Sequence, residues 1–147
     1  MKKIVFTLFM FWILFSGGHN SLAFSFKDDE CVGLKVLTWN IANFGASKSD
    51  EEISYIATVI DDQEIVAIQE VSTGIAGADA VSRLDAELDR SGARWDYLIS
   101  NPTSGDGSER YAILWNTSAA KSIGNPELCS VLDTTINREP FLVRMVA

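Results

Sequence analysis

Two strand-like segments that flank one amphipathic helix constrain the fold more than any other feature of this sequence. Residues 34–41 alternate and are rich in β-forming residues, and residues 65–71 are a short apolar run, so both are predicted to be strands. Between them, Ser49 and Glu52 have the spacing of a capping box. Apolar residues then recur at helical spacing, at Ile53, Ile56, Ala57 and Ile60. This order predicts a crossover between two parallel strands.

The rest of the chain continues the alternation of helix and strand. A second helix is predicted at residues 77–90, with Val81, Leu84 and Leu88 on one face and Gly92 at its end. Further strands are expected at residues 95–99, 110–116, near 121 and at 140–146, and the loop at 100–108 is polar and rich in glycine. A length of 147 residues suits one domain, and the element order predicts an α/β fold.

Two polar residues end the first two predicted strands. If these strands are parallel neighbours, Asn40 and Glu70 lie at the same edge of the sheet, where open α/β sheets bind ligands. Glu70 is expected to share a face with the apolar residues Val66 and Ile68. A carboxylate on a row that faces the core is costly unless it is paired or bound to a metal.

These residue types suit a metal–phosphate site. Mg²⁺ accepts one or two carboxylates and leaves positions for phosphate oxygens and water, and an asparagine adds a polar group without adding charge. We therefore expect Asn40 and Glu70 to form the floor of such a site. The alternative is structural: Glu70 pairs with Arg110 or another basic residue, and Asn40 caps a turn.

The first 23 residues have the pattern of a secretory signal peptide. Two lysines precede an apolar run at residues 4–15 that only Thr7 interrupts, and Ser21 and Ala23 offer small residues for cleavage. The run is shorter than the roughly 20 apolar residues that a membrane span needs. We expect a Sec-type signal cleaved near Ala23, a secreted or periplasmic mature chain of residues 24–147, and no stable membrane insertion after cleavage.

Removal of this leader changes the inventory of charged and reactive residues. The only histidine, His19, is lost with it, and acidic residues then outnumber basic residues by ten. This excess gives no overall attraction to DNA, although Arg110, Arg138 and Arg144 are able to form a local basic strip. In an oxidising compartment Cys31 and Cys129 are candidates for a disulfide, and the alternative is that their partner cysteines lie elsewhere.

Four segments in series carry a resemblance to a known superfamily. They read "LKVLTWNIANFG", "EIVAIQEV", "SERYAILWN" and "NREPFLVRM". In this order and spacing they resemble the N-terminal half of the endonuclease/exonuclease/phosphatase superfamily, and most closely its deoxyribonuclease-like secreted members. The match spans nearly all of residues 24–147, and a series of motifs is far more specific than any one of them.

The resemblance implies a four-layer α/β sandwich, of mixed sheets flanked by helices, and Mg²⁺-dependent hydrolysis of DNA or another phosphodiester, with Ca²⁺ or Mn²⁺ as further metals. It places Glu70 on the metal-binding glutamate and Asn40 on the asparagine of the metal–phosphate site. Glu109 falls on the catalytic-site glutamate that orients a histidine. Arg138 falls on an arginine of the substrate-binding face, beside which Arg110 is a second substrate-binding candidate.

The catalytic histidines of this superfamily belong to its C-terminal half. The resemblance therefore implies that this chain is a truncated, inactive member whose site is completed by a complementary C-terminal segment. A non-catalytic secreted binding module is the alternative from another functional class. A phosphodiesterase or phosphatase acting on lipid or sugar phosphates is a further alternative on the same scaffold.

Overall fold

The computed structural model describes residues 3–5, 33–132 and 136–147. The predicted leader lies outside the described residues apart from β1 (Lys3–Val5), and Cys31 lies outside them as well. None of the helices in the described part of the chain is long and apolar enough to cross a membrane. Signal cleavage and the pairing of Cys31 with Cys129 therefore remain predictions.

A four-stranded mixed sheet forms the centre of the molecule. Its order is β2 (Val36–Phe44), β3 (Ile65–Val71), β5 (Arg110–Asn116) and β4 (Trp95–Ile99). β2 and β3 are parallel, and the other two pairs are antiparallel. The parallel pair confirms the predicted crossover and brings the carboxyl ends of β2 and β3 to one edge of the sheet.

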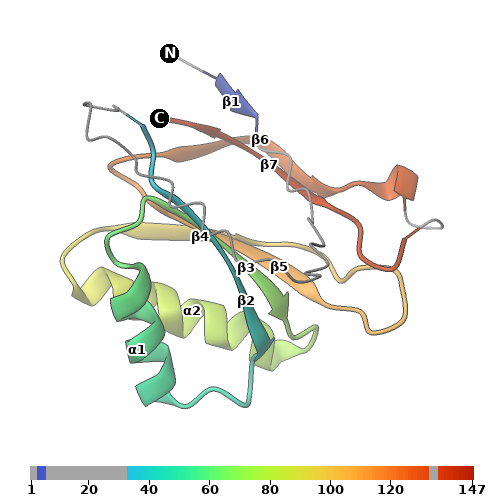
Figure 1. Ribbon diagram of the computed structural model, residues 1–147, viewed down its shortest axis with the longest axis horizontal. Helices are drawn as coiled ribbons and strands as arrows, with labels where there is room; N and C mark the ends of the chain where they lie inside the picture. Colours follow the sequence, from blue (N-terminus) through green and yellow to red (C-terminus); the bar gives the residue numbers. More distant parts are fainter. Residues whose placement is uncertain (1–2, 6–32, 133–135) are drawn as a thin grey trace, which may run out of the picture.

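Both helices cover the same face of this sheet (Figure 1). α1 (Asp50–Ile60) begins at the predicted capping box, in which Ser49 and Glu52 each accept a hydrogen bond from the other's backbone N–H. α2 (Ile75–Arg90) begins two residues before its predicted start. The apolar faces of the two helices pack on buried residues of the sheet, among them Phe44, Val66, Ile68, Val71, Ala112 and Leu114.

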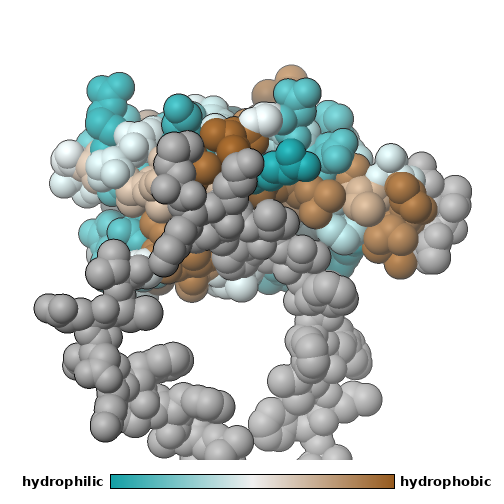
Figure 2. All heavy atoms as spheres, turned by 90° about the horizontal axis from the view of Figure 1, so that it is seen from above, coloured by the Kyte–Doolittle hydropathy of each residue, from teal (hydrophilic) through white to brown (hydrophobic). Residues whose placement is uncertain are grey.

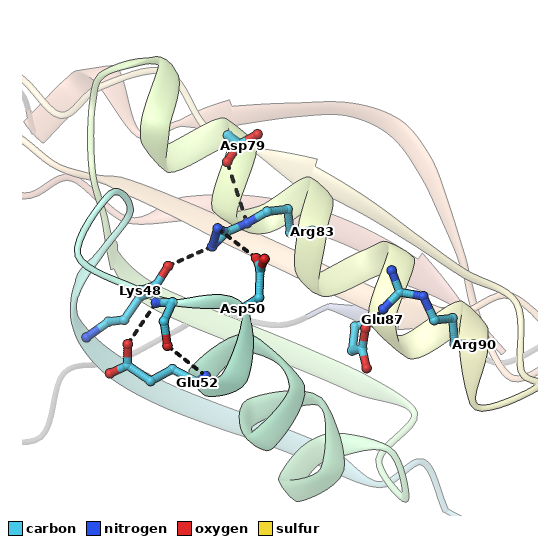
Figure 3. Close-up of polar contacts among 8 residues, drawn as sticks. Lys48, Asp50, Glu52, Asp79, Arg83, Glu87 and Arg90 are labelled. Carbon is cyan, nitrogen blue, oxygen red and sulfur yellow. Dashed lines mark hydrogen bonds and ion pairs between the residues drawn. The ribbon is translucent and has the colours of Figure 1, made fainter.

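An arginine on α2 fastens the beginning of α1 (Figure 3). The guanidinium of Arg83 donates a hydrogen bond of 2.8 Å to the Lys48 carbonyl oxygen and forms ion pairs with Asp50 at 3.2 Å and Asp79 at 3.5 Å. Three contacts from one planar group fix its orientation. The loop that leaves β2 is thereby held against the second helix.

A three-stranded antiparallel sheet covers the other face of the central sheet (Figure 1), in the order β1, β7 (Phe141–Val146) and β6 (Lys121–Leu128). A second apolar cluster joins the two sheets and contains Ile65 and Trp115 with Val143 and Met145. Figure 2 views the molecule from above, where the three-stranded sheet lies in Figure 1, and shows hydrophobic residues among hydrophilic ones on this surface. The described chain thus has a helix layer and two sheet layers, which confirms the α/β class.

Candidate functional site

The carboxyl end of β3 departs from regular strand geometry. Ile68 pairs with Ala112 and Val71 pairs with Arg110, so three steps along β3 match two steps along β5. The extra residue makes a β-bulge, and Glu70 has a left-handed backbone with φ of 59°. An L-residue with a side chain rarely adopts this conformation, which commonly occurs at functional sites.

The bulge corrects the predicted orientation of Glu70. Val66 and Ile68 point into the core beneath the helices, as expected for a continuous row. Glu70 does not continue this row, because the extra residue changes the alternation, and its side chain is half-buried rather than in the core. Its carboxylate instead turns toward β2.

Asn40 and Glu70 meet at the predicted edge of the sheet. The Asn40 Nδ2 donates a hydrogen bond of 2.9 Å to the Glu70 Oε1. Among the described residues, Glu70 forms no ion pair with Arg110, so the structural alternative based on that pair is wrong. The bond uses one carboxylate oxygen, and among the described residues no partner is seen for Oε2 of Glu70, so this oxygen is able to accept a ligand.

A second polar pair lies beside the first on the same two strands. Asn40 is in register with Gln69, and Gln69 Nε2 donates a hydrogen bond of 3.1 Å to Thr38 Oγ1. Sequence reasoning did not select Thr38 or Gln69 for the site. Both residues alternate with core-facing residues of their strands, which is a signal that their side chains lie on the opposite face. To place them beside Asn40, however, the register of β2 and β3 is also needed.

An ion pair between a buried glutamate and an exposed arginine lies near this edge, just before β5. Arg138 Nε is 3.2 Å from Glu109 Oε1, and Glu109 is only 9% exposed. Burial raises the pKa of the Glu109 carboxyl; the positive charge of Arg138 opposes this rise, and the negative charge of Glu70 adds to it. Val71, next to Glu70, pairs with Arg110, next to Glu109, so the two carboxylates lie on adjoining strand ends.

Two further side chains follow Glu109 at the beginning of β5. Tyr111 is half-buried, and burial raises the pKa of its hydroxyl, with a further rise from the charge of Glu109. Arg110 is half-buried, and its Nε is a buried donor without a hydrogen-bond partner among the described residues. The ion pair of Glu109 and Arg138 therefore lies beside the strand end that carries Glu70, whereas Arg110 makes no ion pair with either glutamate among the described residues.

The donor set decides which metals suit the site. In the described part of the chain, no group of three or more histidine, cysteine, aspartate or glutamate side chains is arranged to hold a metal ion. A single carboxylate with a neutral amide beside it suits Mg²⁺, because this ion retains several waters and uses substrate phosphate oxygens as ligands. Ca²⁺ prefers six to eight oxygen ligands and fits this set less well.

The ends of β2 and β3, which carry the site residues, pack tightly against each other and against the start of α2. A Cβ atom at Gly45 would lie 2.5 Å from Ser72 Oγ, and a Cβ at Gly77 would overlap the Ser72 carbonyl oxygen. Ser72 N also donates a hydrogen bond of 2.9 Å to the Phe44 carbonyl oxygen. The ends of β2 and β3 and the first turn of α2 are thus held in close contact.

No protein-family model and no curated protein matches this chain.

Proposed function

We propose that this chain carries the metal- and phosphate-binding part of a Mg²⁺-dependent phosphodiesterase, with DNA as the first candidate substrate. The hydrogen bond between Asn40 and Glu70 carries the proposal, because it joins a carboxylate and an amide at the carboxyl ends of adjacent parallel strands. The left-handed backbone of Glu70 supports it, since the fold accepts a strained residue in order to present this carboxylate.

Each residue has a role that follows from its chemistry. Glu70 would hold Mg²⁺, and Asn40 fixes the orientation of the Glu70 carboxylate. When bound, the metal supplies positive charge that stabilises the negative charge developing on a phosphodiester. Arg138 forms an ion pair with Glu109 through Nε, and among the described residues its terminal nitrogens form no ion pair, so they suit two parallel hydrogen bonds to a phosphate.

General acid–base catalysis requires a further component in this proposal. Histidine is the usual proton-transfer group near neutral pH, and the only one in the sequence, His19, belongs to the predicted leader. We propose that a complementary segment supplies this group and adds the remaining layer of a four-layer sandwich. On this basis the exported chain binds a metal and a phosphodiester but does not cleave the phosphodiester alone.

Binding of Mn²⁺, a paramagnetic substitute for Mg²⁺, tests the metal site. Electron paramagnetic resonance titration of the full chain should show weaker binding in Asn40→Ala by about 10–100-fold, the usual effect of losing a residue that orients a ligand. Glu70→Gln should weaken binding further, because it removes the coordinating charge. The control is Glu51→Gln, an exposed glutamate of α1.

Two outcomes contradict the proposal. Equal Mn²⁺ affinity in wild type and Glu70→Gln would exclude Glu70 as the metal ligand. Nicking of plasmid DNA by the chain alone, abolished by Glu70→Gln, would show that this chain supplies its own proton-transfer groups.

A further inference from the structure

We infer that Glu139 is a positioning residue that holds Arg138 and Glu109 together from outside the site. The inference rests on the proposed function, in which Arg138 binds phosphate. Glu139 is only 3% exposed, and both of its carboxylate oxygens lie 3.1 Å from the backbone nitrogen of Ser104. Burying a carboxylate costs free energy unless it accepts hydrogen bonds. The contact with Ser104, in the loop at residues 100–109, offsets this cost for Glu139.

The contacts around Glu139 form a closed ring. Thr103 N donates a hydrogen bond of 2.9 Å to the Glu109 carbonyl oxygen, and Glu109 N donates one of 3.1 Å to Thr103 Oγ1. Ser104, next to Thr103, is bound to Glu139, and Arg138, next to Glu139, is paired with Glu109. Because Ser104 follows Thr103 and Glu139 follows Arg138, each of these three contacts restricts the positions of the residues in the next one.

Backbone packing brings the same two segments into contact. A Cβ atom at Gly105 would overlap the Cα of Asn137, so the loop lies directly on the residues that precede β7. Ser108 Oγ also donates a hydrogen bond of 2.6 Å to the Thr103 carbonyl oxygen and closes the loop on itself. Among the described residues, the Glu139 side chain links this closed loop to residues 137–139, which include Arg138.

The test compares Glu139→Ala and Glu139→Gln in the full chain, with Glu127→Gln, an exposed glutamate of β6, as the matched control. The readout is the rate at which the Arg138 Nε–H exchanges with solvent, measured by NMR with exposed Arg144 as an internal reference. Loss of a charge-assisted hydrogen bond should speed this exchange about tenfold in Glu139→Ala. Glu139→Gln keeps one acceptor oxygen for Ser104 N–H and should restore part of the protection.

A second variant keeps the inference testable if Glu139→Ala does not fold. Thr103→Val removes the acceptor for Glu109 N–H at nearly constant volume and should also speed exchange at Arg138. Unchanged Arg138 exchange in either folded variant would overturn the inference.

Titration with dimethyl phosphate separates the inference from the proposed function. Weaker binding in both Glu139→Ala and Arg138→Ala would support both. Faster Arg138 exchange in Glu139→Ala, with phosphate affinity unchanged in Arg138→Ala, would support the positioning role and overturn the assignment of Arg138 to phosphate.

Discussion

Residues 65–68 and residues 69–71 are consecutive parts of β3, yet they differ in burial and in pairing. The first part is buried throughout and keeps its register with both neighbouring strands. The second part contains the bulge and directs Gln69 and Glu70 toward polar partners on β2. The regular part stabilises the fold through buried side chains. The irregular part contains a strained backbone, at Glu70, and this conformation directs polar side chains toward β2.

The largest expected effect comes from the regular part. Ile68→Ala should lower the free energy of unfolding by about 2–5 kcal/mol, because Ile68 is 1% exposed and its loss leaves a cavity beneath the helices. Gln69→Ala, one residue further on, removes a single hydrogen bond and should cost about 1 kcal/mol. Urea denaturation measures both, and equal losses would remove the contrast between the two parts of β3.

A smaller effect should come from the left-handed backbone of Glu70. Glu70→Ala and Glu70→Gly both remove the carboxylate and its bond to Asn40, but only glycine relieves the strain at φ of 59°. The glycine variant should be more stable than the alanine variant by about 1 kcal/mol in urea denaturation. Equal stability would mean that the backbone at this position is not strained.

The smallest effects should be opposite pH dependences of two buried glutamates. Burial raises the pKa of Glu109, so its contribution to stability is present below the unfolded pKa and is lost as pH rises through the folded pKa. Hydrogen bonds from the Ser104 side chain and, to a smaller extent, from its backbone N–H lower the pKa of Glu139, so its contribution is present above the unfolded pKa and is lost as pH falls through the folded pKa.

Neutral substitutions separate these two contributions. Relative to wild type, Glu109→Gln should gain stability as pH rises through the folded-state pKa of Glu109, whereas Glu139→Gln should be less stable at neutral pH and recover in acid. Thermal unfolding across the acidic range measures both trends. Parallel trends for the two variants would contradict the assigned causes of the pKa shifts.

The sequence was sufficient where structure follows from local pattern. The bounds of β3, β4 and β5 match their predictions, because each segment is rich in β-forming and apolar residues and lies between polar segments. β2 begins two residues later than predicted and continues to Phe44, past Asn43, whose φ of 51° interrupts the alternation that defines a strand. Periodicity detects regular strands but not the irregular residues that extend them.

The candidate site was predictable only in part for the same reason. The meeting of Asn40 and Glu70 follows from parallel strand ends, but the side to which Glu70 points depends on the bulge. Glu109 was selected by resemblance alone, and Arg138 by resemblance and as part of a basic strip, because no local pattern joins the two residues. Glu139 was not selected, since its burial depends on a backbone N–H 35 positions away.

The glycine at position 77 has an evolutionary consequence. Glycine inside a helix is less favourable than alanine by about 1 kcal/mol, so selection acting on α2 alone would replace it. The Ser72 carbonyl oxygen leaves no room for the methyl group, and the obstacle comes from outside the helix. The history of residue 77 is therefore tied to the end of β3, and the helix retains its weakest residue because the residue that follows this strand occupies the space that any replacement would need.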